Sequence, residues 1–284
     1  MLIVIAAVLA VLAYGAYTVY QRFVVQVLTI PGCQAGFGDN AVALDFGQAA
    51  DAATIAGVAV RNHLPSRALT IAYATAWQES KLENLTYGDR DSVGIFQQRP
   101  SQGWGSTAEL EDPVYATQAF LNKLVQVPAY QTIPVYQAAQ DVQASADGYA
   151  YQQYATTGQL MAADYTTAPH AVTCWYSPDA QAAAQNVSPR LNLTGAAKEL
   201  DHVFGTPGDA GSALTGVTRL SSETADQVVP VAGAGWTVAD WLVANASSYG
   251  ITQVSYDGYQ WTASLTETSW QADPAASVSG IVAS

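Results

Sequence analysis

The chain has 284 residues, half of them hydrophobic, and a formal net charge of −13. Its length and apolar content suffice for one large or two modest packed domains and argue against extensive disorder. Lys and Arg are scarce, which argues against nucleic acid or anionic lipid as a partner because phosphate binding needs clustered basic side chains.

The N-terminal segment is almost wholly apolar. Leu2 to Tyr20 carry no charge, and roughly 20 such residues suffice to cross a bilayer as a helix. A cleaved signal peptide or a buried helix is the alternative, but a signal peptide usually has a basic start and a shorter apolar region. The sequence therefore predicts a single-pass membrane anchor over residues 1–28.

Two cysteines, Cys33 and Cys174, lie far apart in the chain. Without a CxxC pair, and with only three histidines, they do not predict a zinc site. They are either a disulfide, which requires an oxidising compartment, or two unrelated buried thiols. We expect the disulfide, and with it a body on the extracytoplasmic side of a cell membrane.

Two Ala-rich helices are expected next, over 47–63 and 67–81, the first capped by Asp45. The second is apolar nearly all round and should be central and buried. Glu79 extends its apolar face to the edge of the core. Partial desolvation there would raise the pKa of this carboxyl and let it hold a proton near neutral pH. The alternative is an ordinary surface Glu at a helix end.

A polar segment over 84–105 contains too many Gly, Asp, Ser and Gln residues for a helix or a core strand, which predicts an ordered loop. A protonated acid beside such a polar loop suits the cleavage of a glycosidic bond. That reaction also needs a means of stabilising a positively charged sugar. Asp89 and Asp91 are candidates for a second carboxylate. The alternative is a local ion pair with Arg90 that shapes the loop.

Further helices are expected after Asp112-Pro113, where Asp is a cap and Pro takes the first helical position, and after Pro134. Another is expected over 193–204. The composition then shifts to Gly, Ser, Thr, Ala and Asp, which predicts a linker over 206–222. Residues 223–284 are expected to form a small α/β module, with a helix over 235–248 and a hairpin turning at Asp257-Gly258.

Several blocks together resemble a known superfamily. The run Gln78-Glu79-Ser80, followed by Ser92-Val93-Gly94-Ile95-Phe96-Gln97, resembles the signature of lytic transglycosylases and goose-type lysozymes. The string from Ala74 to Gly105, with a VQxSA element at Val142 and an ELDxVFG element at Glu199, resembles a membrane-anchored actinobacterial subgroup. The resemblance covers about residues 33–205.

This resemblance implies roles for particular residues. Glu79 matches the family's general acid, and Ser80 would orient its carboxylate by a hydrogen bond. The third block of the family commonly reads AYN with a Gly, whereas residues 145–151 here read SADGYAY. The tyrosine that relatives place near the acid is therefore Tyr149 or Tyr151. Asp91 is either a second acid or a brace for the loop, and we favour the brace. The expected substrate-binding residues are Ser80, Ser92, Gly94, Gln97, Gln98 and Tyr149.

The expected fold is mainly α: a transmembrane helix, a lysozyme-like domain over 29–205, the linker and the small α/β module. The expected reaction is cleavage of the β-1,4 bond between N-acetylmuramic acid and N-acetylglucosamine in peptidoglycan, as a lytic transglycosylase or a muramidase. It requires no metal or organic cofactor. A non-enzymatic wall-binding or scaffold protein is the alternative.

The C-terminal module resembles the closing helix and hairpin of a zinc carboxypeptidase-like domain. Such domains need His and Asp ligands, whereas the histidines here, His63, His170 and His202, all precede the module. We therefore expect no metal site and interpret the module as a remnant used for wall binding or packing.

Overall fold

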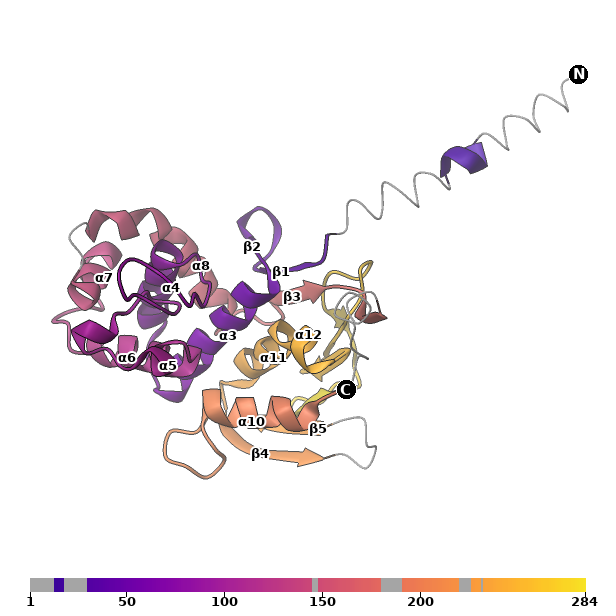
Figure 1. Cartoon of the computed structure of the whole chain (residues 1–284). Helices are drawn as coiled ribbons and strands as arrows, with labels where there is room; N and C mark the ends of the chain where they lie inside the picture. The colour runs from indigo at the N-terminus through magenta and orange to yellow at the C-terminus, as the bar shows by residue number, and fades with distance from the viewer. Residues whose placement is uncertain (1–12, 18–29, 145–147, 180–190, 220–225, 231) are drawn as a thin grey trace, which may run out of the picture.

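The computed structural model describes residues 13–17, 30–144, 148–179, 191–219, 226–230 and 232–284. Figure 1 shows a group of helices at one end of the molecule and a mixed helix and strand region at the other, with helix α3 running between them. One continuous hydrophobic core includes buried residues from both regions.

Helices α3 (Phe46–Arg61) and α4 (Ser66–Glu79) form the centre of the fold. The capping box of α3 is complete, because Asp45 accepts from the backbone of Gln48 and the Gln48 side chain accepts in return. Tyr73 of α4 is fully buried, and its hydroxyl donates to the carbonyl of Ala52 in α3 at 2.8 Å. The hydroxyl of this aromatic residue is therefore satisfied inside the core.

Shorter helices complete the first region. They are α5 (Thr107–Leu110), α6 (Pro113–Leu124), α7 (Val135–Gln143) and α8 (Ala155–Asp164), with 3-10 turns η2 (Gly38–Asn40), η3 (Pro100–Gln102) and η4 (Gly148–Tyr154). Asp112 caps α6 and Pro113 occupies its first turn, as predicted.

A three-stranded antiparallel sheet joins the two ends of this region in the order β2 (Val42–Leu44), β1 (Gly32–Ala35), β3 (Val172–Trp175). Cys33 and Cys174 stand directly opposite each other in the β1 and β3 pair. They form a disulfide, so the predicted pairing is confirmed.

The second region combines helices α10 (Leu193–Phe204), α11 (Gly235–Ala244) and α12 (Ala246–Tyr249) with a six-stranded antiparallel sheet. The sheet order is β4 (Leu214–Arg219), β5 (Asp226–Pro230), β9 (Ile281–Ala283), β6 (Gln253–Tyr256), β7 (Tyr259–Thr262), β8 (Gln271–Ala272). The predicted hairpin is present between β6 and β7, and Asp257 and Gly258 both have positive φ, as a type I′ turn requires.

Two tryptophans attach the second region to the three-stranded sheet. The indole of Trp261 donates to the carbonyl of Cys174 at 2.9 Å, and that of Trp270 donates to the carbonyl of Val172 at 2.8 Å. Both rings are buried. Strand β3, which carries Cys174, is thus bonded to the second region as well as to β1.

The prediction of a mainly α fold was wrong, because the protein is mixed α/β with two antiparallel sheets. Strand β4 lies inside the segment predicted as a linker from its Gly, Ser and Thr content. Strands β1 and β3 pair across 141 residues of sequence. Neither strand shows a long alternating pattern, so local periodicity did not reveal them.

The predicted membrane anchor and the cell-membrane localisation are also corrected. No helix in the described part of the chain is both long and apolar enough to cross a bilayer. Of residues 1–28, the structure describes only 13–17, which are helical; residues 1–12 and 18–29 lie outside the described residues.

Candidate active site

The packing of helix α4 sets the position of Glu79, its last residue. Gly158 of α8 lies against α4 so closely that a Cβ atom on it would come 2.5 Å from the carbonyl oxygen of Thr70. Glycine therefore allows the two helices to cross in direct contact. The end of α4 is held against α8 and the η4 turn, which brings distant residues to the Glu79 carboxylate.

Two side chains hydrogen-bond to the half-buried Glu79 carboxylate. The Tyr151 hydroxyl donates to Oε1 at 2.6 Å, and the Gln143 amide donates to the same oxygen at 3.3 Å. Burial raises the pKa of Glu79 above its ordinary value, although the hydrogen bonds from Tyr151 and Gln143 lower it in part. A raised pKa is the direction that a general acid requires, because the group must be protonated before it reacts.

The structure decides between the two tyrosines of the third block. Tyr151 is 2% exposed and contacts Glu79, whereas Tyr149 is 69% exposed and packs its ring edge against Tyr136. Both lie in η4. Of the two candidates, Tyr151 therefore lies beside the acid, and Tyr149 does not contact it in the structure.

The residues that follow Glu79 connect α4 to the polar loop. Ser80 Oγ donates to the carbonyl of Ile95 at 2.7 Å and lies 3.2 Å from that of Ala76, so its hydroxyl contacts the backbone and not the Glu79 carboxylate. The amide of Gln143 donates to the next carbonyl, that of Phe96, also at 2.7 Å. Two successive carbonyls of the loop are thus fixed by residues that flank or contact the acid.

Gly94 is needed for the shape of this loop. Gly94 has φ of +77°, and a Cβ atom on it would lie 2.2 Å from the carbonyl oxygen of Leu110. Only glycine allows both this conformation and this approach. Ser92 is buried, and its backbone N–H donates to the carbonyl of Asp89.

The two glutamines also contact the protein backbone. The amide of Gln97 donates to the carbonyls of Tyr87 at 3.3 Å and Gly94 at 3.2 Å. Gln98 is 1% exposed, and its amide donates to the carbonyl of Ala116 in α6. These contacts show how the loop is held together beside Glu79, and they leave the predicted substrate contacts of the glutamines as predictions.

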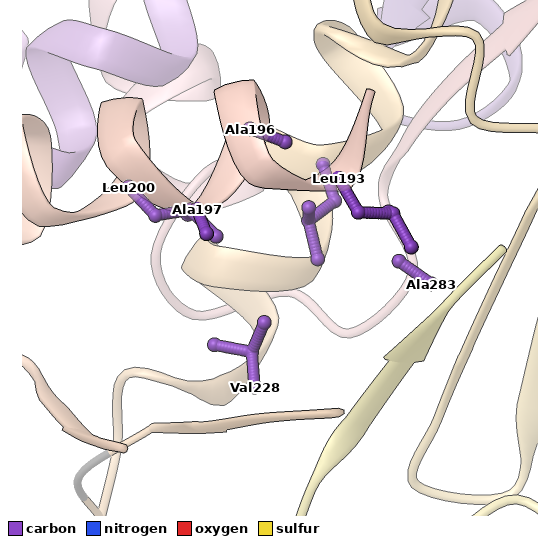
Figure 2. Close-up of a pocket in the computed structure, with 7 residues that line it drawn as sticks. Leu193, Ala196, Ala197, Leu200, Val228 and Ala283 are labelled. Carbon is purple, nitrogen blue, oxygen red and sulfur yellow. The ribbon is translucent and has the colours of Figure 1, made fainter. Parts of the chain in front are cut away.

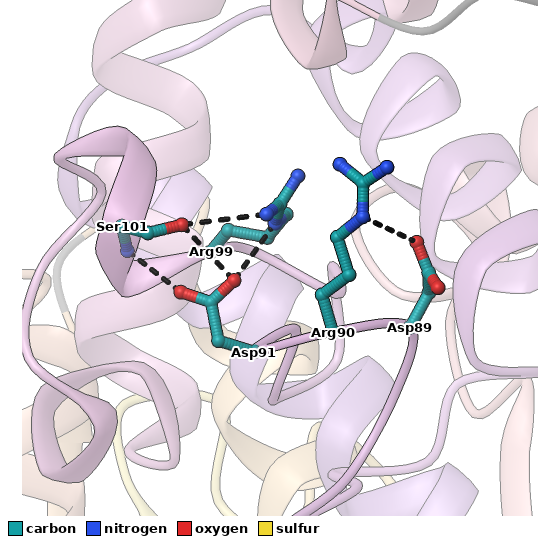
Figure 3. Close-up of polar contacts among 5 residues, drawn as sticks. All are labelled: Asp89, Arg90, Asp91, Arg99 and Ser101. Carbon is teal, nitrogen blue, oxygen red and sulfur yellow. Dashed lines mark hydrogen bonds and ion pairs between the residues drawn. The ribbon is translucent and has the colours of Figure 1, made fainter.

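The run Asp89-Arg90-Asp91 separates into a brace and an exposed ion pair (Figure 3). Asp91 accepts from the guanidinium of Arg99 at 2.9 Å and from the backbone and hydroxyl of Ser101 at 2.7 and 3.0 Å. These bonds, led by that from the Ser101 backbone, hold the pKa of Asp91 well below its usual range. Asp89 and Arg90 are exposed and 3.9 Å apart. Asp91 thus has the contacts of a loop brace.

Trp77, near the end of α4, forms an aromatic pair with Tyr154 that the sequence did not predict. The rings of Trp77 and Tyr154 are stacked, with centroids 6.2 Å apart, and Lys81 Nζ contacts the Tyr154 hydroxyl. The indole of Trp77 donates to the sulfur of Met161 at 3.0 Å. Gln143 was missed as well, although it belongs to the VQxSA element. A Gln at the end of an amphipathic helix gives no signal of its contact 64 residues away.

Two other buried acids lie outside this group of contacts. Asp240 of α11 is fully buried, and neither carboxylate oxygen has a hydrogen-bond partner within the described residues. Burial raises the pKa of Asp240 well above its usual range, and the nearby Val172 N–H offsets this only in part. Burial also raises the pKa of Asp164 to about 6.

The described residues contain no group of three or more His, Cys, Asp or Glu side chains that would hold a metal ion. An apolar pocket lies between α10, α11 and the larger sheet (Figure 2). Its lining residues are Leu193, Ala196, Ala197, Leu200, Val228, Leu242 and Ala283. None of these side chains can transfer a proton, so the pocket offers no catalytic group.

No protein-family model matches the chain, and no curated protein is significantly similar to it in sequence. Evidence for function therefore comes from the chain itself, above all from the contacts around Glu79.

Proposed function

We propose that this protein cleaves the glycan strands of peptidoglycan at the β-1,4 bond between N-acetylmuramic acid and N-acetylglucosamine, with Glu79 as the general acid. The observation that carries the proposal is the half-buried Glu79 carboxylate with the Tyr151 hydroxyl 2.6 Å away. These two residues are 72 positions apart in sequence. Their contact joins the first and third blocks of the lytic transglycosylase resemblance.

The environment of Glu79 supports the proposal in chemical terms. A general acid must be protonated before it reacts, and burial raises the pKa of this carboxyl. It must then be stable as a carboxylate once its proton has moved to the leaving oxygen. The hydrogen bonds from Tyr151 and Gln143 favour that ionised form.

The first step transfers the Glu79 proton to the glycosidic oxygen as the bond from the muramyl C1 to that oxygen breaks. The positive charge at C1 is then quenched by one of two nucleophiles, from which the Glu79 carboxylate recovers a proton. Attack by the 6-hydroxyl of the same sugar gives a 1,6-anhydro product, and attack by water gives a reducing sugar. In this scheme Asp91, paired with Arg99, shapes the loop and does not react.

The test is digestion of purified peptidoglycan by the wild-type protein and by Glu79→Gln, with mass analysis of the soluble products. General acid catalysis contributes on the order of 10²–10⁴-fold, so Glu79→Gln should lose at least about 100-fold in rate. Glu83→Gln is the matched control, because Glu83 is an exposed acid four residues further along. Its activity should equal that of the wild type.

The product mass distinguishes the two reactions, because an anhydro product is lighter than the reducing sugar by one water. A wild-type protein that is no more active than Glu79→Gln would refute the enzymatic proposal. Retained binding to peptidoglycan in that case would favour a wall-binding or scaffold protein.

A further inference from the structure

Both described hydrogen bonds to the Glu79 carboxylate reach the same oxygen. Tyr151 and Gln143 each donate to Oε1, and no described residue donates to Oε2. A hydroxyl such as that of Tyr151 can also accept, so it does not by itself determine which oxygen is protonated. The amide of Gln143 does determine the protonated oxygen, because its NH₂ group only donates and its oxygen only accepts. What has to be established is which of the two faces Glu79.

The orientation of the Gln143 amide follows from its second contact. The amide nitrogen lies 2.7 Å from the carbonyl oxygen of Phe96. A carbonyl only accepts, so the NH₂ group and not the amide oxygen must face it. The same nitrogen is 3.3 Å from Glu79 Oε1, so its two protons serve the two acceptors. Towards Glu79, therefore, Gln143 acts only as a donor.

The Phe96 carbonyl, which orients this amide, belongs to a well-packed part of the loop. Phe96 is fully buried, and its ring stacks on that of Phe120 with centroids 4.5 Å apart. The preceding carbonyl, that of Ile95, is fixed by Ser80 at the end of α4. Gln143 thus ties the carboxylate to a section of loop that is itself attached to the helix carrying the acid.

We infer that Gln143 is a positioning residue that makes Oε2 of Glu79 the oxygen that carries and delivers the catalytic proton. This inference rests on the proposed function. Oε1 is turned towards donors from Tyr151 and Gln143 and receives their hydrogen bonds. Oε2 is left to hold the proton, pass it to the leaving oxygen and recover a proton from the 6-hydroxyl or from water.

The inference is tested with Gln143→Met, which keeps the length of the side chain and removes both donors. Hydrogen bonds to charged groups are strong enough that their loss should lower kcat by about 10-fold. KM should stay unchanged, because the amide contacts the acid and not the substrate. Gln137→Met is the matched control, since Gln137 is exposed on the same helix, and it should match the wild type in both parameters. A rise in KM at unchanged kcat would instead make Gln143 a substrate contact.

A second measurement does not depend on activity. The protein is labelled with ¹³C at the Glu side-chain carboxyl and titrated by NMR. The Glu79 signal is identified by its loss in Glu79→Gln. Its titration midpoint should move to higher pH in Gln143→Met, and still further in Gln143→Glu, which places a second carboxylate beside it. Midpoints that do not move would overturn the inference. If the midpoints move but the wild-type protein has no activity, the proposed function is refuted, while the hydrogen bond from Gln143 to Glu79 stands.

The choice of oxygen is read directly from a crystal structure at atomic resolution, taken below the Glu79 midpoint. The longer carboxyl C–O bond identifies the protonated oxygen, and in the wild type it should be that to Oε2. A longer bond to Oε1 would overturn the assignment. Gln143→Met should lose this preference.

Discussion

The disulfide between Cys33 and Cys174 is expected to supply a large part of the stability of the protein. The two cysteines are 141 residues apart. In the chain-entropy account, closing a loop of that size removes about 17 cal/mol/K from the unfolded ensemble, or about 5 kcal/mol at 25 °C. The native stability of a typical domain is only about 5–15 kcal/mol. Replacing both cysteines with alanine should therefore cost a third or more of the total.

The folded state itself should change little in this variant. The β1 and β3 strands keep their antiparallel pairing through four aligned residue pairs, and alanine buries no new polar group. The loss should therefore come mainly from the greater freedom of the unfolded chain. A wider unfolded ensemble also exposes more surface, so the dependence of the unfolding free energy on urea should steepen.

The assay is urea unfolding followed by tryptophan fluorescence, with and without a reductant. The reductant should lower the midpoint of the wild type towards that of the double variant and leave the double variant unchanged. If reduction and double substitution each shift the unfolding free energy by less than about 1 kcal/mol, the reasoning from loop entropy is refuted.

Two other predictions concern ionisable groups. Tyr151→Phe removes a donor from the ionised form of Glu79, which raises the pKa of that carboxyl, so the alkaline limb of the pH–rate profile should move to higher pH; Tyr149→Phe should leave the profile unchanged, and an unmoved profile in Tyr151→Phe would contradict the contact. Asp240 has a raised pKa in the folded protein, so the folded state keeps a proton that the unfolded chain releases above about pH 3.9. The unfolding free energy should therefore fall as the pH rises from 4 to 8, and should fall less in Asp240→Asn. Urea unfolding at pH 5 and pH 8 measures this difference, and equal pH dependences would exclude Asp240 as a source.

Local chemistry made some elements predictable from the sequence. Asp45 and Asp112 begin α3 and α6 as caps, and Asp257-Gly258 turns the hairpin between β6 and β7. In each case a few adjacent residues determine the backbone conformation, so neighbours in sequence carry the information. Glu79 at the end of a buried helix was found in the same way.

Contacts between distant segments were not predictable in this way. The β1 and β3 pairing depends on a partner 141 residues away, and β4 has a composition that resembles a linker. The choice of Tyr151 over Tyr149 depends on which side of the η4 turn faces α4, and two residues in one turn share the same local sequence signal. Gln143 was missed for a similar reason, since its partners Glu79 and Phe96 lie in other elements.

The position of the disulfide also has a mechanical consequence. Cys33 and Cys174 enclose Glu79, Tyr151 and the polar loop, and their Cα atoms are 4.0 Å apart. A pulling force applied to the chain before Cys33 and after Cys174 passes through the covalent bridge from one cysteine to the other. The enclosed residues carry none of that tension along their backbone. The geometry around Glu79 is therefore shielded from stretching of the chain by any polymer or neighbour attached outside the bridge.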